Sequence, residues 1–383
     1  MVIVSKRWTR VVLFLQFLFL VCNAELTFQE IAPESIVQSI KIGYGIVDCV
    51  DLYSQPSLKH PLLMNHTIQM QPSYFPNDVL RDIGSKSSCS EEVRSDIECP
   101  TGSVPILRSN RSFRSTMPLR ALVGSGPDYD PNSTIRLAMV STGRHSDPIY
   151  GSEAEFSVYE PSVGEGQSPR FSSAFLAVQN GAPPTYSMIM VGWDVNPQYY
   201  GDDRAHFEIV WVDKGTACAN LGCRGFVQQS KQVFPGLKIT PVSTVGGQQS
   251  YLHLKVFKDQ KTGNWWLIYG DGHHPVGYWP KELFTYMADA ADAVSWFGMV
   301  AAARGEPTPP MGSGQSPDQG EGKAAYFENI RVVDASHNLV VPSLGGCQTH
   351  VTVPSCYALG HFRNSDDGSG LRFLYGGGGC HPE

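Results

Sequence analysis

The chain has 383 residues, of which 42% are hydrophobic and 17% charged, a balance typical of globular proteins that excludes an intrinsically disordered one. A formal net charge of -7 and a pI near 5.9, with no cluster of Lys and Arg, exclude nucleic acid as an expected partner. The 38 Gly and 27 Pro favour many turns between short strands.

The first 24 residues have the features of a signal peptide. Lys6, Arg7 and Arg10 precede the apolar run "VVLFLQFLFLV", which is too short to span a bilayer. The small residues of "CNA" then favour cleavage after Ala24. The sequence predicts a secreted protein with no membrane attachment after cleavage, and an uncleaved anchor is the less favoured alternative.

Sequons and cysteines agree with export. Asn65, Asn110 and Asn132 each begin an Asn-x-Ser/Thr tripeptide and are predicted glycosylation sites. Of the nine cysteines, Cys22 leaves with the signal, and the even remainder favours disulfides. The close pair in "CANLGC" fits a local staple or half a metal site, and the staple is favoured because no second pair has zinc spacing.

Residues 25–145 differ from the rest and are predicted to form a small N-terminal prodomain. They begin with the amphipathic run "ELTFQEIAPESIVQSIKI", which predicts a helix. Polar, turn-rich sequence follows, and "TMPLRALVGSGPDYDPNST" is typical of a flexible connection.

Residues 146–383 contain short alternating runs separated by turns, which predict an antiparallel β-sandwich. The runs are "AEFSVY", "HFEIVWV", "YLHLKVFK", "AAYFENIRVV" and "RFLYGG". One helix is expected in "PKELFTYMADAADAV", where Pro280 stands at the start and apolar residues follow at helical spacing.

Two methionines occupy unusual places in this domain. In "SMIMVGWDVNPQYYGDD", alternation puts Ile189, Val191 and Trp193 on one face of a strand, and Met190 and Asp194 on the other. Later, "VSWFGMV" places another methionine, at position 299, beside a tryptophan and a glycine.

Common catalytic motifs are missing from the sequence. "GGGG" near the C-terminus lacks the Lys and helix of a phosphate loop, and no Gly-x-Ser-x-Gly elbow marks a nucleophile. Adjacent His273 and His274 would point to opposite faces of a strand, so no metal site is predicted there and no cofactor is expected.

Aromatic residues are concentrated in "GNWWLIYGDGHHPVGYWPK". Because neighbours on a strand face opposite ways, Trp265 and Trp266 cannot both fill the core. One of them is expected to face an outer layer or a cleft, where aromatic rings suit extended, proline-rich or sugar ligands.

These motifs together resemble the neprosin family, plant secreted proteins whose founding activity is a glutamic prolyl endopeptidase. The resemblance rests on "VGWDVNPQYYGDD", "CANLGCRGFVQ", "GNWWLIYGDGHHPVGYWPKELFT", "PPMGSGQSPDQGEGKAAYFENIRVVD" and the C-terminal "SCYALGHFRNSDDGSGLRFLYGGGGCHPE". "DCVDLYSQPSLKHPLLMNHTIQMQPS" and "CPTGSVPILR" resemble the family's activation domain.

The resemblance implies a large, twisted antiparallel β-sandwich with a concave cleft, covered by a propeptide, in which two facing glutamates act as acid and base. In the matching motifs, these positions read Met190 and Met299. Glu208, on the next strand, is the best substitute carboxylate, but it would have no partner at position 299. Asp194 shares the face of Met190 but lies four residues, about 13 Å, along the strand.

The resemblance also implies three disulfides, Cys49–Cys99, Cys218–Cys223 and Cys356–Cys380, and leaves the state of Cys89 and Cys347 open. An aromatic platform in the cleft is expected from five residues. These are Trp193, Trp266, Tyr278, Trp279 and Trp296.

The leading hypothesis is a catalytically degenerate, monomeric family member in the apoplast or cell wall that binds a proline-rich peptide or a cell-wall protein. One alternative is an active acid endopeptidase that cleaves at proline through a substitute carboxylate such as Glu208. The other is a cell-wall carbohydrate-binding β-sandwich.

Overall fold

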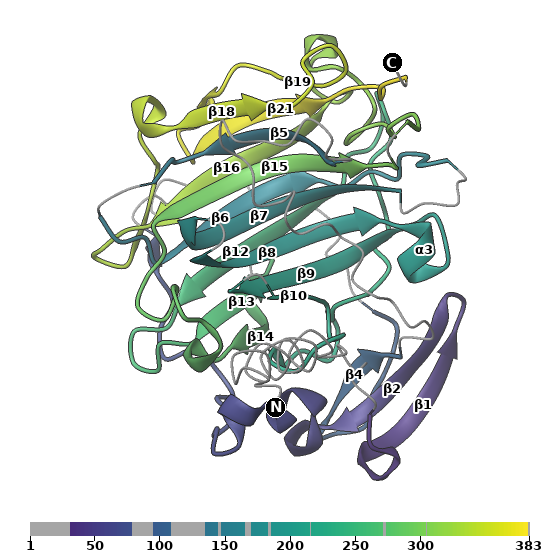
Figure 1. Ribbon diagram of the computed structural model, residues 1–383, viewed down its shortest axis with the longest axis vertical. Helices are drawn as coiled ribbons and strands as arrows, with labels where there is room; N and C mark the ends of the chain where they lie inside the picture. Colours follow the sequence, from purple (N-terminus) through teal and green to yellow (C-terminus); the bar gives the residue numbers. More distant parts are fainter. Residues whose placement is uncertain are drawn as a thin grey trace, which may run out of the picture.

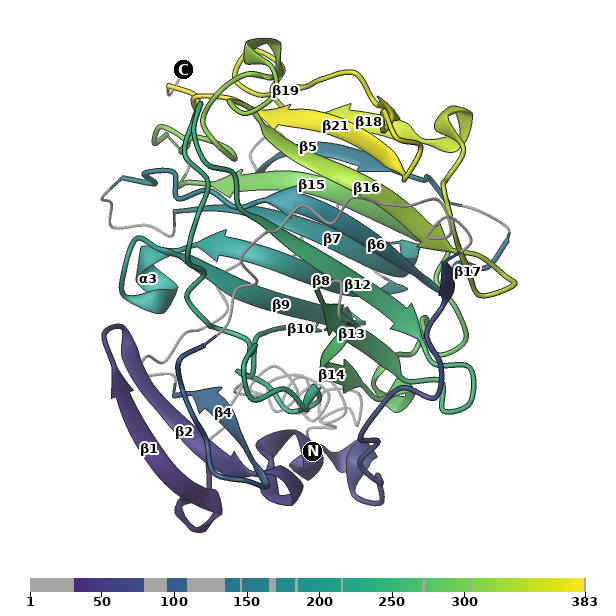
Figure 2. The same ribbon diagram turned by 180° about the vertical axis from the view of Figure 1, so that it is seen from behind.

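The computed structural model describes residues 31–78, 95–108, 135–144, 147–164, 170–182, 185–214, 216–270, 273–303 and 305–381. Two sheets, antiparallel except for the parallel pair β3 and β17, lie one behind the other and form the predicted sandwich (Figures 1 and 2). The predicted signal peptide, Cys89, Asn110 and Asn132 lie outside the described residues, whereas Asn65 is exposed in a turn.

The first sheet has seven strands in the order β10-β9-β8-β7-β15-β5-β18. Their bounds are β5 Ile135–Ser141, β7 Phe171–Ala182, β8 Thr185–Val195, β9 Ala205–Asp213, β10 Thr216–Ala219, β15 Ala293–Ala301 and β18 Gln348–Val351. Because β5 belongs to this sheet, the sandwich includes residues that precede the predicted boundary at 146.

The second sheet has eleven strands, with the main path β11-β14-β13-β12-β6-β16-β17-β3 and with β21 joining β16 to β19 and β20. Their bounds are β3 Asn77–Asp78, β6 Gly151–Ser157, β11 Val227–Gln228, β12 Tyr251–Lys258, β13 Trp265–Tyr269, β14 His274–Trp279, β16 Ala325–Val333, β17 Asn338–Val340, β19 Ala358–Leu359, β20 Arg363–Asn364 and β21 Leu371–Gly376.

The main core lies between the sheets and confirms the predicted alternation. It takes the inward-facing residues of each predicted strand, namely Ala154, Phe156 and Val158 of the β6 run, Phe207, Ile209 and Trp211 of β9, and Leu252, Leu254 and Val256 of β12. Burying alternate side chains of two facing sheets is what holds a sandwich together.

The N-terminal region forms a three-stranded sheet of β1 Ile36–Ile42, β2 Gly45–Asp51 and β4 Ser103–Leu107, beside the end of the sandwich formed by β9, β10 and β14 (Figure 1). The helix predicted from residue 25 is therefore wrong over residues 36–42. This run is rich in Ile and Val, and its backbone pairs with β2 from Ile36↔Val50 to Ile42↔Gly45.

The helix predicted in residues 280–294 is also wrong, since only the single turn η5 Lys281–Leu283 forms. Neighbouring side chains take the backbone groups that a helix would need. Thr285 N donates to Asp213 Oδ1 at 2.8 Å, and the Met287 carbonyl accepts from Trp265 Nε1 at 3.0 Å. The apolar residues here fill the core from a loop, which periodicity alone does not distinguish from a helix.

The remaining helical elements are short. They are α3 Pro197–Tyr200 and the single turns η1 Pro33–Ser35, η2 Leu52–Ser54, η3 Pro56–Lys59, η4 Pro61–Leu63, η6 Pro317–Gln319 and η7 Leu344–Gly346. In the described ranges, no helix is long and apolar enough to cross a membrane.

All three predicted disulfides are present: Cys49–Cys99, Cys218–Cys223 and Cys356–Cys380. Cys347 is a half-buried free thiol. Disulfides of this kind persist in oxidising compartments, which fits export.

Gly192, at the centre of β8, has no room for a side chain. A Cβ there would lie 1.9 Å from the carbonyl oxygen of Ala174 on β7. We expect Gly192→Ala to push the two strands apart and to destabilise the fold by about 2–3 kcal/mol or more, as overpacking does. Thermal unfolding of the purified variant measures this. Gly345→Ala, where no atom lies within 4 Å of the added Cβ, is the matched control, and equal melting temperatures for both variants would contradict the prediction.

Candidate functional site

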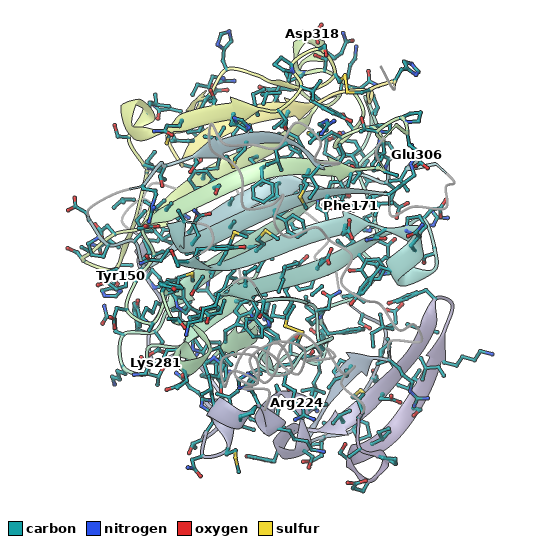
Figure 3. All side chains as sticks on the ribbon, in the orientation of Figure 1. Tyr150, Phe171, Arg224, Lys281, Glu306 and Asp318 are labelled. Carbon is teal, nitrogen blue, oxygen red and sulfur yellow. A yellow bond between two sulfur atoms is a disulfide. The ribbon has the colours of Figure 1, made fainter. Side chains whose placement is uncertain are left out.

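The two methionines lie on the outer face of the seven-stranded sheet, which we call the methionine face. Met190 of β8 and Met299 of β15 are both 0% exposed. The apolar cluster around them comes from β5, β7, β8, β9, β10 and β15, and Phe171, labelled in Figure 3 at the start of β7, belongs to it. Both positions are therefore apolar packing positions.

The strand register does not set the two methionines side by side. Met190 pairs across with Ala177 on β7, whereas Met299 pairs with Ser173 on the same strand. The offset is four residues, or about 13 Å along the strands, with β7 between them. Ser173 pairs on its other side with Asp194 of β8, so Asp194, and not Met190, is level with Met299.

Asp194 and Glu208 form a buried pair of carboxyl groups on the methionine face. Glu208 of β9 lies across from Gly192, two residues before Asp194 on β8. Asp194 is 0% and Glu208 2% exposed, and the two carboxyl groups lie close enough for each to shift the pKa of the other. Position 299 is a methionine and gives Glu208 no carboxyl partner. Asp194 supplies that partner instead, which the sequence alone did not predict.

The pair is arranged to hold one proton. Burial raises the pKa of both groups, and for Glu208 the charge of Asp194 raises it further. Asp194 also accepts hydrogen bonds, including one of 2.6 Å from Ser173 Oγ, which favour its ionised form. Asp194 Oδ2 and Glu208 Oε2 are buried and have no hydrogen-bond partner elsewhere in the described residues. A proton on Glu208, donated to Asp194, satisfies the pair and avoids two adjacent buried charges.

The turn α3 follows β8 directly after Asp194 and Val195. Asn196 caps it by accepting from Tyr199 N at 3.2 Å, and Gly201 ends it in the left-handed conformation at φ 87°. Burial, with the neighbouring carboxyl charge, raises the pKa of Tyr199 and Tyr200, so both phenols stay protonated.

A polar network continues outward from α3. Asn220 Nδ2 donates to Tyr200 OH at 3.0 Å, and the Tyr200 ring stacks on His206 with centroids 3.9 Å apart. His206 in turn contacts Asp202 at 2.8 Å. This network thus ties α3 to β9.

The five aromatic residues expected in a cleft are all 0% exposed. Trp193, Trp279 and Trp296 lie in the core between the sheets, whereas Trp266 and Tyr278 lie on the opposite, outer face of the eleven-stranded sheet. They do not form one platform. Trp265 and Trp266 lie on opposite faces of β13, as alternation predicted.

No metal site is formed by the residues within the described ranges, where no group of three or more His, Cys, Asp or Glu could hold an ion. His273 has a positive φ of 53° and its ring stacks on Phe75 of the N-terminal region at 4.8 Å. The ring contributes to packing there.

The raised pKa of Glu208 makes stability depend on pH. A carboxyl that binds its proton more tightly when folded stabilises the fold fully below its unfolded pKa of about 4.3, and this contribution is lost as pH rises through the folded value. We expect Glu208→Gln to leave the melting temperature near pH 4 almost unchanged and to raise it at pH 7, at about 2–4 °C per kcal/mol.

Differential scanning fluorimetry from pH 4 to 8 tests this. Glu34→Gln, the same change at an exposed position, is the control and should shift neither end of the profile. A Glu208→Gln protein that is less stable than the parent at pH 7 would show that the carboxylate is ionised and favourable in the fold.

Comparisons with known proteins agree with the motifs and the sandwich. The family model described as Neprosin matches residues 168–378, and the model described as Neprosin activation peptide matches residues 39–113. Among solved structures, the beta-porphyranase from the human gut bacterium Bacteroides plebeius shows 8% identity and a TM-score of 0.20, with 43% of this chain and 64% of that chain covered, which is too low to indicate a shared fold. Because the Neprosin model alone matches more than half of the 383 residues, and the activation-peptide model precedes it, the chain belongs to the neprosin family.

Proposed function

We propose that this neprosin-family protein has lost the family's peptide hydrolysis, which depends on two glutamates, and acts outside the cell as a peptide-binding protein. The observation that carries the first half is the state of Met190 and Met299, which are completely buried in an apolar cluster at the family's glutamate positions. A thioether neither donates nor accepts a proton in water, so neither residue can activate a water or protonate a leaving amine.

The expected loss of rate is large. General acid–base catalysis contributes about 10² to 10⁴ per group, so replacing both groups removes most of the enhancement. Methionine fits the vacated volume because its unbranched side chain adapts to irregular apolar spaces. Burial of two methionines also avoids the desolvation cost of two carboxylates.

A second candidate, an acid endopeptidase, is favoured by the pair Asp194 and Glu208. One protonated and one ionised carboxyl are what acid–base hydrolysis of a peptide requires. Against this candidate, neither group is more than 2% exposed. A substrate carbonyl would therefore reach them only if the residues that bury them moved.

Peptide binding is supported by the surroundings of Trp266 and Tyr278. These aromatic residues contact a segment of the chain's own N-terminal region, whose Gln69 N donates to Tyr278 OH at 2.9 Å. No comparable observation favours sugar binding. Among the described residues, Tyr53 is the one aromatic among the exposed large apolar side chains, so no aromatic ledge is available.

We further propose a monomer that is cleaved after Ala24, secreted to the apoplast or cell wall, and glycosylated at Asn65, Asn110 and Asn132. The three disulfides and the exposure of Asn65 support this location.

Hydrolysis is tested with a proline-containing fluorogenic peptide at pH 3 to 5, using the purified secreted protein and an active neprosin as positive control. We expect no cleavage above the rate without enzyme, because no carboxyl replaces the family pair. Cleavage that disappears in both Glu208→Gln and Asp194→Asn would overturn the proposal in favour of the second candidate. Cleavage that survives both substitutions would contradict both mechanisms.

A further inference from the structure

Residues 66–78, which we call the resident segment, run along the outer face of the eleven-stranded sheet and end in β3, which pairs with β17 (Figure 2). The face itself is an apolar cluster of Val227, Phe257, Trp266, Ile268, Tyr278, Val333 and Leu339. Ile68, Tyr74 and Phe75 of the segment pack against it. The segment has no regular structure before β3.

A polar anchor holds the first half of the resident segment. Asp259, in the turn between β12 and β13, accepts hydrogen bonds from Ser73 N and Ser73 Oγ and from Gln69 Nε2. The Gln69 side-chain oxygen accepts from Thr262 and Asn264 of the same turn, at 2.8 and 2.9 Å. The side chains of one glutamine and one serine are thus both hydrogen-bonded to this turn.

This anchor exists independently of the segment. Asp259 also accepts from the backbone N–H groups of Lys261 and Thr262, at 2.9 and 3.0 Å, so its carboxylate is fixed by its own turn. A receptor group held in place by its own loop lowers the entropic cost of binding.

An aromatic pair anchors the middle of the resident segment. Tyr74 OH donates to the carbonyl of Lys258 at 2.9 Å and contacts His337 Nδ1 at 2.8 Å, while its ring meets Phe257 edge-on. Phe75 stacks on His273 with centroids 4.8 Å apart. The two rings bury apolar surface, and the Tyr74 hydroxyl fixes the orientation of the segment through its hydrogen bonds.

A charge pair anchors the end. Asp78 accepts from Arg331 NH1 at 2.6 Å, and Arg331 NH2 donates to buried Glu153 at 3.0 Å. Glu153 therefore orients the Arg331 guanidinium towards Asp78 of the segment. Such a geometry selects a carboxylate at the end of the ligand.

The segment is held without a covalent link among the three disulfides. Cys49–Cys99 lies inside the N-terminal region, and the other two lie inside the sandwich. Pro72 and Pro76 restrict the backbone of the resident segment, which reduces the ordering cost of an extended ligand.

We propose that the outer face of the eleven-stranded sheet is a peptide-recognition surface, and that its ligand is a proline-containing peptide with the chemistry of the resident segment. That chemistry is Gln and Ser, then an aromatic pair, then a carboxylate. The inference deepens the proposed peptide-binding function by naming the surface and the ligand class. The resident segment is the occupant in the intact chain, and a free peptide of this chemistry takes the same place when the segment is weakened.

The test uses the full secreted chain and a fluorescein-labelled peptide with the sequence of residues 64–79, followed by fluorescence anisotropy. In the parent protein the surface is occupied, so we expect weak binding. Tyr74→Ala/Phe75→Ala removes the aromatic anchor of the segment, and we expect at least tenfold tighter binding of the probe. Equal affinity for both proteins, or no binding to a variant with an unchanged circular dichroism spectrum, would overturn the proposal.

Two controls make the outcome specific. Tyr53→Ala/Leu62→Ala changes exposed residues of the same region, 70% and 60% exposed, and should bind the probe no better than the parent. A probe carrying alanine at the positions of Tyr74 and Phe75 should not bind. If the first variant fails to fold, Gln69→Ala/Ser73→Ala weakens the polar anchor instead, with the same expected gain and the same contrary outcome.

Mass spectrometry of the recovered probe separates this inference from the proposed function. Intact probe with the expected gain in affinity supports both. Cleaved probe with that gain contradicts the loss of hydrolysis and leaves the surface assigned. Intact probe without a gain contradicts the surface alone.

Discussion

The two-residue period of β8 decides the face on which every candidate residue of the methionine face lies. Packing of Ile189, Val191 and Trp193 into the core between the sheets forces Met190 and Asp194 outward. A shift of one residue in register would exchange these sets and bury a carboxyl in the apolar core. The core therefore determines which side chains of β8 lie on the outer face.

Within that constraint, the outer face differs from the one that the family resemblance implies. The expected glutamate positions are apolar, while a carboxyl pair of another origin lies nearby, between Asp194 and Glu208. Buried in this way, two carboxyls favour a shared proton over two charges. Because both side chains are buried, the proton that they share stays out of contact with solvent.

Sequence alone predicted which residues of β6, β8, β9 and β12 face the core, because alternation is a local property. It did not predict that Asp194 meets Glu208, because the pairing register between β8 and β9 is set by the whole sheet. The loop at 281–291 and the strand Ile36–Ile42 were misread as helices for a similar reason. Their hydrogen-bond partners, Asp213, Trp265 and β2, are tertiary neighbours that no local period reveals.

None of the three disulfides, Cys49–Cys99, Cys218–Cys223 and Cys356–Cys380, links the N-terminal region to the sandwich. This affects how strongly the resident segment competes with an outside ligand. While the chain is intact, its own segment competes at an effective concentration on the order of millimolar. A single cut between Arg108 and Ile135 would turn this into competition between separate molecules. Occupancy of the surface would then depend on dilution, so one peptide bond would set whether the protein is closed or open to outside ligands.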